Sequence, residues 1–161
     1  MSGPTAEGEI VHGTLVAKGR AGVLLRGASG AGKSDLALRL MGLGADWRLV
    51  SDDQVLLTRG SNRLVGKAPA TIAGKLEVRG VGIMEVATTA AADICLIVDL
   101  VTRKAVPRMP EAGQSFDILG VRIPFRCLHG PDASSPLKIA MLLEVITKQQ
   151  PAGKRGDLAK M

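Results

Sequence analysis

The segment Gly27-Ala28-Ser29-Gly30-Ala31-Gly32-Lys33-Ser34 decides the fold of this chain. It satisfies the Walker A, or P-loop, pattern G-x-x-x-x-G-K-[ST] at every constrained position. The glycines permit positive φ angles and a close approach of the backbone to a phosphate, and the successive backbone N–H groups form a nest for an anion. The segment therefore predicts a loop that binds the polyphosphate of a nucleoside triphosphate.

The residues on either side of this loop supply the expected context. Val23-Leu24-Leu25 precedes it as an apolar strand, and apolar residues at helical spacing follow it as far as Leu43. The N-terminus of that helix adds positive potential where a phosphate would lie. In a P-loop the lysine, here Lys33, reaches the β- and γ-phosphates, and the hydroxyl of Ser34 binds Mg²⁺. We expect ATP and Mg²⁺ as ligands.

Further from the loop, short apolar segments alternate with turns that contain Gly or Pro. We expect strands at 10–16, 21–26, 48–50, 55–57 and 121–128, apolar runs at 76–78, 82–86 and 94–98, a turn at 18–20, a loop at 107–113, and helices at 33–43 and 137–147. This pattern predicts an α/β fold, a P-loop nucleotide-binding core with a mixed β-sheet. The 161 residues suit a single domain over 1–148 and a flexible C-terminal tail over 149–161.

Composition excludes several other classes of protein. The net charge of +6 would suit nucleic acid, but two Phe, one Trp and no Tyr leave little for base stacking, so we expect no nucleic-acid partner. The sequence has no run of about 18 uncharged apolar residues and no secretory signal, so we expect no membrane association. Cys95 and Cys127 match no metal motif and are interpreted as buried thiols of a protein in the reducing cytoplasm.

A P-loop enzyme also needs an acidic residue at the end of a neighbouring strand, and two places in the sequence could supply it. Ile94 to Asp99 reads as a generic Walker B strand that ends in one carboxylate. Arg48 to Asp53 is shorter, but it ends in the pair Asp52-Asp53. The pattern favours Asp99, whereas the chemistry favours the pair, because one carboxylate can stay ionised while the other moves a proton.

Four segments, taken in order, resemble the catalytic domain of the bacterial HPr kinase/phosphorylase family. They are His12-Gly13-Thr14-Leu15-Val16, the P-loop 27–34, Leu49-Val50-Ser51-Asp52-Asp53, and Leu76-Glu77-Val78-Arg79-Gly80-Val81-Gly82-Ile83. The last segment is similar to the family signature E-[IV]-R-G-[LV]-G-[IV]. The resemblance implies the HPr kinase/PEP carboxykinase-like fold, and it implies the short form that consists of the catalytic domain.

The resemblance also implies a role for each matching residue. Asp52 corresponds to the carboxylate that takes the proton from the target serine, and His12 corresponds to the histidine that assists it. Lys33 corresponds to the lysine that contacts the transferred phosphate. Ser34 and Glu77 correspond to the Mg²⁺ ligands.

The same resemblance implies roles for three further residues. Asp53 and Arg79 lie in matching motifs, which implies supporting roles, and Arg108 matches the position of a catalytic arginine. Where family members that catalyse phosphorolysis carry a Gly-Arg-Asn segment, this chain has Ser135-Pro136-Leu137-Lys138. The sequence thus predicts the kinase reaction and leaves the phosphorylase reaction open.

The resemblance implies a protein-serine kinase that acts on the phosphocarrier protein HPr and assembles as a homo-oligomer, a hexamer in the family. Two other readings stay open from the sequence. One is a small-molecule kinase or generic P-loop NTPase that uses Asp99 as its metal carboxylate. The other is a regulatory module that senses ATP without transferring a phosphate.

Overall fold

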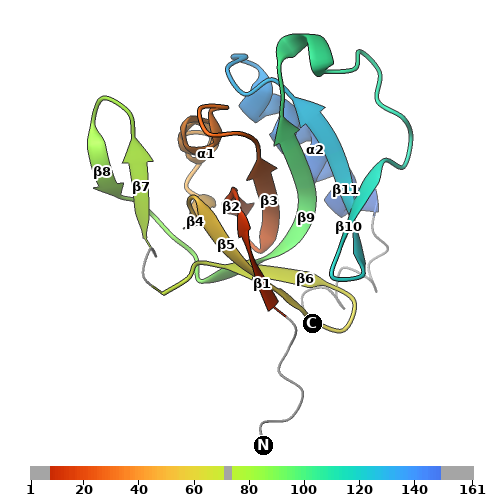
Figure 1. The fold of residues 1–161 in the computed structure, drawn as a ribbon, viewed down its shortest axis with the longest axis horizontal. Helices are drawn as coiled ribbons and strands as arrows, with labels where there is room; N and C mark the ends of the chain where they lie inside the picture. The colour runs from red at the N-terminus through yellow and green to blue at the C-terminus, as the bar shows by residue number, and fades with distance from the viewer. Residues whose placement is uncertain (1–7, 71–73, 150–161) are drawn as a thin grey trace, which may run out of the picture.

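The computed structural model describes residues 8–70 and 74–149, and a mixed β-sheet organises this part of the chain (Figure 1). The elements in chain order are β1 (Gly8–His12), β2 (Thr14–Lys18), β3 (Ala21–Arg26), α1 (Lys33–Met41), β4 (Trp47–Ser51), β5 (Gln54–Arg59), β6 (Leu64–Lys67), β7 (Lys75–Val78), β8 (Gly82–Glu85), β9 (Ala91–Leu100), the 3₁₀ helix η1 (Arg103–Ala105), β10 (Ser115–Ile118), β11 (Val121–Leu128) and α2 (Ser135–Gln149).

The long strand β9 lies at the centre of the sheet. Strand β3 pairs with it in parallel along one edge, while β6, antiparallel, and β11, parallel, share its other edge. The sheet continues from β3 through β2 to β4, and from β6 through β5 to β1. Because the P-loop begins where β3 ends, the phosphate loop starts from the middle of the sheet.

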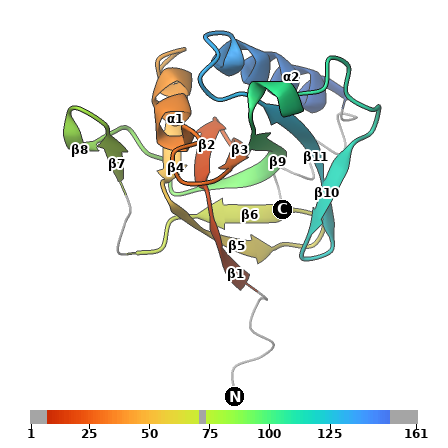
Figure 2. The ribbon, with the colours of Figure 1, turned by 45° about the horizontal axis from the view of Figure 1, so that its top comes forward.

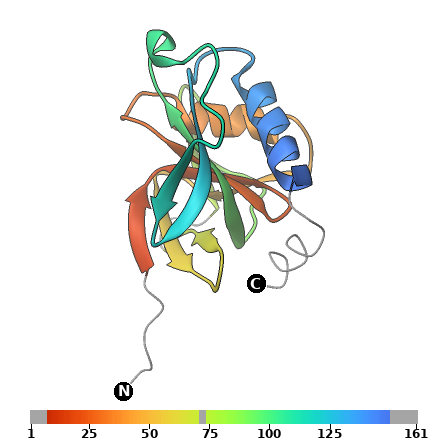
Figure 3. The same cartoon turned by 90° about the vertical axis from the view of Figure 1, so that its right-hand side faces the viewer.

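Apolar residues fill both faces of the central strands, as the near-continuous apolar sequence of β3 requires. On one face, Val23 and Leu25 pack with residues of α1 and α2, which lie next to each other on that side (Figure 3). On the opposite face, Leu24 and Ile97 pack with residues of β5, β6 and β10, which close the other side of the curled sheet (Figure 2). Both cores therefore hold β3 and the start of the P-loop in place.

The prediction of a single strand over 10–16 is wrong in one respect, because the structure has two strands there, separated at Gly13. Strand β1 pairs with β5, whereas β2 pairs with β3 and β4. A Cβ atom on Gly13 would lie 2.9 Å from the carbonyl oxygen of Leu25, so only glycine lets the chain pass this close. The division brings the residues around Gly13 to the edge of the phosphate loop.

Other predicted elements are confirmed with shifted ends. The turn at 18–20 and the helix after the P-loop are present, although α1 ends at Met41 because Gly42 caps it. Helix α2 begins earlier than predicted, at Ser135, since Pro136 suits the first turn of a helix. The sequence analysis missed β6 and β10, which are each four residues long. The predicted tail begins inside α2, and its residues 150–161 lie outside the described part of the chain.

No helix among the described residues is long and apolar enough to cross a membrane. Both thiols are partly rather than fully buried. Burial, with a contribution from Asp93, raises the pKa of Cys95 to about 11, and burial also raises the pKa of Cys127. Both thiols are therefore protonated and weakly nucleophilic at neutral pH.

Candidate functional site

The P-loop is shaped by two glycines and by the ammonium group of Lys33. Gly30 and Gly32 have φ angles of 87° and 96°, which residues with a side chain adopt at a cost. Lys33, the first residue of α1, is 8% exposed, and its Nζ donates hydrogen bonds to the carbonyl oxygens of Gly27 at 2.8 Å and Ala28 at 3.1 Å. The loop therefore curls around this charge.

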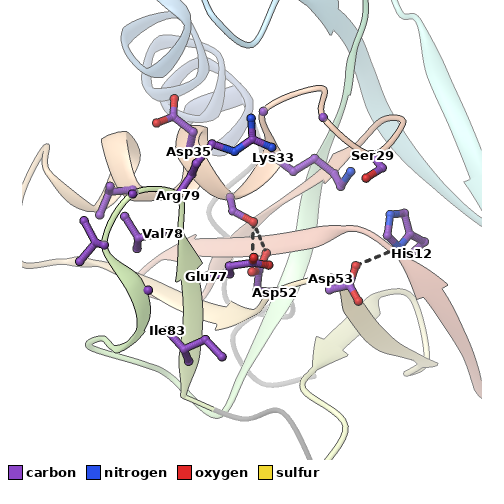
Figure 4. Close-up of a pocket in the computed structure, with 17 residues that line it drawn as sticks. His12, Ser29, Lys33, Asp35, Asp52, Asp53, Glu77, Val78, Arg79 and Ile83 are labelled. Atoms are coloured by element: carbon purple, nitrogen blue, oxygen red, sulfur yellow. Dashed lines mark hydrogen bonds and ion pairs between the residues drawn. The ribbon is translucent and has the colours of Figure 1, made fainter.

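The carboxylate of Asp52, which directly follows β4, is fixed against the start of α1. The Ser34 hydroxyl lies 2.8 Å from Oδ1 and 3.0 Å from Oδ2 of this carboxylate (Figure 4). The hydroxyl of Thr14, a fully buried residue of β2, donates a third hydrogen bond to Oδ1 at 2.8 Å. Strand β4 lies beside β2, so the sheet itself delivers Asp52 to the P-loop serine.

The neighbouring carboxylate of Asp53 is turned outward. Its Oδ1 lies 3.3 Å from Nδ1 of His12, and both side chains are more than half exposed. The backbone of Asp53 has a φ of 71°, and its carbonyl oxygen accepts a hydrogen bond from the N–H of Gly13 at 2.9 Å. Residues 12–14 thus contact both aspartates: Thr14 holds the carboxylate of Asp52, His12 lies against that of Asp53, and Gly13 fixes the backbone of Asp53.

Asp99, the other sequence candidate for a metal carboxylate, is engaged elsewhere. It accepts hydrogen bonds from Nε of Arg26 at 2.7 Å and from Nη2 of Arg26 at 3.1 Å. The Arg26 guanidinium also lies 4.1 Å from the centre of the Phe116 ring and 5.9 Å from that of Phe125. Asp99 therefore ties β9 to the last residue of β3 instead of facing the space beside Ser34.

We expect Asp99→Asn to lower thermal stability while leaving nucleotide binding intact. The change removes one charged partner of Arg26, and charge-assisted hydrogen bonds contribute about 1.5–3 kcal/mol. Thermal unfolding and titration with Mg-ATP measure the two quantities separately. Loss of Mg-ATP binding in a folded Asp99→Asn protein would contradict the structural role of this residue.

A cavity of ≈ 950 Å³ opens in front of the P-loop. Its walls are P-loop residues with the start of α1, the Asp52-Asp53 pair with His12, and the turn of the β7–β8 hairpin. Glu77 and Arg79, both predicted site residues, line the cavity from this hairpin. Segments far apart in the sequence thus place four carboxylates, including that of Asp35 on α1, an imidazole and two cations around one cavity.

The oxygen atoms in this cavity suit Mg²⁺. A hydroxyl on Ser34 and carboxylates on Asp52 and Glu77 are the hard ligands that this ion prefers. Within the ranges 8–70 and 74–149, no three His, Cys, Asp or Glu side chains form a metal cluster by themselves. Proteins usually hold Mg²⁺ through one or two carboxylates together with substrate phosphates.

Comparison with known proteins shows to which family the chain belongs. Residues 4–159 match the family model described as HPr Serine kinase C-terminal domain. The chain belongs to this HPr serine kinase family. It is 36% identical over 157 residues to the HPr kinase/phosphorylase of Lactiplantibacillus plantarum, a match that covers 91% of this chain and 47% of that protein. It is 35% identical over 156 residues to the HPr kinase/phosphorylase of Peptoclostridium acidaminophilum, with 92% and 50% covered.

The fold prediction is confirmed by a solved structure. The HPr(Ser) kinase/phosphatase from Coxiella burnetii matches with a TM-score of 0.73 and 27% sequence identity, over 85% of this chain and 89% of that chain. The chain spans about half the length of the curated HPr kinase relatives, 47% and 50% in the two described above. The matches therefore cover the C-terminal kinase domain.

Arg108, which the family resemblance singled out, does not line the P-loop cavity. It lines a second hollow of ≈ 390 Å³ between the loop after η1, strand β11 and helix α2. Arg126 and Lys138 line the same hollow. The structure thus brings together the other predicted site residues and leaves Arg108 apart from them.

Two residues close to the site were missed by the sequence analysis. Thr14 escaped notice because its role depends on the division at Gly13, which carries no sequence signal of its own. Arg39 of α1 donates to the carbonyl oxygens of Gly130 and Asp132, which lie in the loop between β11 and α2. This loop packs closely on the P-loop, since a Cβ atom on Gly130 would lie 2.7 Å from the carbonyl oxygen of Ala31. Arg39 thereby supports the P-loop from behind.

Proposed function

We propose that this chain is an ATP- and Mg²⁺-dependent protein-serine kinase that phosphorylates the phosphocarrier protein HPr. Membership of the HPr serine kinase family supports the reaction class, and the names of the relatives support the acceptor. The single observation that carries the proposal is the fixed position of Asp52 against the P-loop hydroxyl of Ser34. Phosphoryl transfer needs an oxygen atom near the metal ion and a group that orients the nucleophile, and a carboxylate in this place can supply both.

In this proposal the P-loop residues 27–34 bind the triphosphate through their backbone N–H groups, and Lys33 turns its ammonium group toward the transferred phosphate. Bound Mg²⁺, held by Ser34 and Glu77, would neutralise charge that develops on the phosphate oxygens. Asp52 accepts the proton of the serine hydroxyl as its oxygen attacks phosphorus. The proton moves to a carboxylate oxygen, and the bond from phosphorus to ADP breaks.

His12, Asp53 and Arg79 have supporting roles in the same proposal. His12 and Asp53 form an exposed pair at the mouth of the cavity, where an imidazole can tune the neighbouring carboxylates or contact phosphate when protonated. Arg79 lies across the cavity and adds positive charge. Arg108 contributes to transfer in its own subunit only if its loop moves, because it lines a different hollow.

The phosphorylase reaction is proposed as a second activity of the same residues. Inorganic phosphate would attack the phosphorus of phosphoserine, the serine oxygen would leave with a proton from Asp52, and pyrophosphate would form. The relatives named HPr kinase/phosphorylase support this activity. Family members that catalyse phosphorolysis carry a Gly-Arg-Asn segment at the place where this chain has Lys138. Lys138 lies outside the P-loop cavity, so the kinase is the primary activity in this proposal.

A small-molecule kinase that uses Asp99 as its metal carboxylate is disfavoured by the bidentate contact of Asp99 with Arg26. A purely ATP-sensing module is disfavoured by the carboxylates around the cavity, because sensing alone does not require a proton acceptor beside the phosphates. The proposal also includes a cytoplasmic location and homo-oligomeric assembly, a hexamer by resemblance to the family.

One experiment tests the proposed function. The purified chain is incubated with Mg-ATP and HPr, and the intact mass of HPr is measured before and after inorganic phosphate is added. One added phosphate on a serine supports the kinase, and its loss with release of pyrophosphate supports the phosphorylase. ATP binding without any change in the mass of HPr contradicts the proposed kinase and favours the sensing module or the small-molecule kinase.

A further inference from the structure

The β7–β8 hairpin is a wall of the cavity that stands apart from the main sheet (Figure 1). Its two strands pair only with each other among the described residues. All four residues of β8 are exposed, and the turn residue Val81 is 66% exposed. The hairpin thus presents large apolar side chains to solvent at the edge of a site whose other lining residues are mostly polar, Leu38 of α1 excepted.

The two faces of this hairpin differ in what they contact. Residues directly opposite each other in an antiparallel pair share one face. Leu76 lies opposite Met84, and Leu76 is fully buried in the core, so this pair faces the body of the domain. Glu77 lies opposite Ile83, and both line the P-loop cavity, so this pair faces the site. Ile83 is nevertheless 72% exposed.

We propose that Val81 and Ile83 form the docking surface for the acceptor protein and receive an aliphatic side chain that lies next to its target serine. This inference rests on the proposed function and adds a rule of substrate recognition to it. The side chains of a directly opposed pair lie about 4.5–5.5 Å apart at their Cβ atoms. Any hydroxyl delivered to the carboxylates of Asp52 and Glu77 therefore comes within side-chain reach of Ile83.

The surroundings favour a protein acceptor over the other possible occupants of this surface. In the proposed function the P-loop anchors the nucleotide by its phosphates, and no Phe, Tyr or Trp side chain lines the described cavity to stack a base. On the opposite side of the cavity mouth, His12 and Asp53 are polar and exposed. The acceptor segment should consequently be amphipathic, with its apolar side toward the hairpin and its polar side toward His12.

Two adjacent residues of β8 provide a matched test. Ile83→Ser removes an exposed apolar side chain that lines the cavity, whereas Met84→Ser removes one from the opposite face of the same strand. Burying an aliphatic side chain typically contributes about 1.5–3 kcal/mol, so we expect Ile83→Ser to raise the KM for HPr, and its Kd in direct binding, by roughly tenfold or more. Its kcat at saturating HPr and its Kd for Mg-ATP should match the wild type.

The control variant Met84→Ser should keep the KM for HPr within about threefold of the wild-type value, which corresponds to the effect of a typical surface substitution. Melting temperatures show that each variant is folded, and Val81→Ser provides a second cavity-side variant. An unchanged KM in both cavity-side variants would overturn the inference, as would equal effects of Ile83→Ser and Met84→Ser. A raised Kd for Mg-ATP would assign the surface to the nucleotide, and a changed oligomeric state would assign it to another copy of the chain.

The two proposals fail in different ways. If wild-type protein binds HPr in a manner that depends on Ile83 but transfers no phosphate, the proposed kinase function fails while the docking surface stands. If wild-type protein phosphorylates HPr and Ile83→Ser leaves KM and Kd for HPr unchanged, the docking surface fails while the kinase function stands.

Discussion

Replacing Lys33 with alanine is expected to weaken Mg-ATP binding by about a hundredfold or more. The ammonium group of Lys33 donates two hydrogen bonds to P-loop carbonyl oxygens, and it is the one cation within the loop. Its loss leaves two acceptors without a donor and removes the charge that the triphosphate would meet. In the proposed complex this ammonium group would donate to phosphate oxygens instead, and hydrogen bonds to charged groups contribute about 1.5–3 kcal/mol each, so two of them account for an effect of this size.

The measurement is calorimetric titration of Mg-ATP into the folded variant. Lys18→Ala is the matched control, because it removes the same charge from an exposed lysine outside the cavity that pairs only loosely, at 3.9 Å, with Asp46. The control should bind Mg-ATP as the wild type does, which separates the P-loop effect from the change in net charge. Equal Kd values for Lys33→Ala and wild type would contradict the assignment of the loop.

Replacing Asp52 with asparagine is expected to reduce phosphate transfer to HPr by roughly 10²–10⁴-fold, the usual contribution of a general base. Asparagine keeps the shape of the side chain, and its carbonyl oxygen can still accept a hydrogen bond from Thr14 or Ser34. The P-loop itself is unchanged, so the Kd for Mg-ATP should stay within a few-fold of the wild-type value. Rates from single-turnover transfer and Kd values from titration distinguish the two effects.

Asp53→Asn is the neighbouring control for this experiment. Asp53 is exposed and contacts His12 instead of the P-loop, so we expect a smaller loss of roughly tenfold in transfer. If Asp53→Asn removes transfer and Asp52→Asn does not, the outer carboxylate is the base and the proposed division of labour is reversed. Similar losses in both variants would mean that the pair acts as a unit.

The phosphate loop and the core elements could be predicted from the sequence because their signals are local. The P-loop pattern, the apolar strand before it and the helical spacing after it all lie within about 20 residues, and the structure places β3 and α1 there. The division of 10–16 at Gly13 could not be predicted, because its cause is the approach of Leu25 from a paired strand. The short strands β6 and β10 gain their stability from partners distant in sequence.

The choice between Asp99 and Asp52 shows the same limit at the site. The sequence pattern favours Asp99 and the chemistry favours the Asp52-Asp53 pair, so the sequence leaves the choice open. In three dimensions Asp99 contacts Arg26, 73 residues away, whereas Asp52 contacts Ser34, 18 residues away, so Asp52 is the one that lies beside the P-loop serine. Arg108 lies on a loop beside β11 and α2. Its place outside the P-loop cavity depends on these distant elements, so the local sequence pattern could not predict it.

A crystal structure of the chain with a non-hydrolysable ATP analogue and Mg²⁺ tests the central claim most directly. We expect the triphosphate in the loop at 27–34, with Lys33 at its terminal phosphates and the carboxylate of Asp52 facing the γ-phosphate from the side where the serine would enter. A triphosphate bound elsewhere, or an Asp52 carboxylate that points away from the γ-phosphate, would contradict the account.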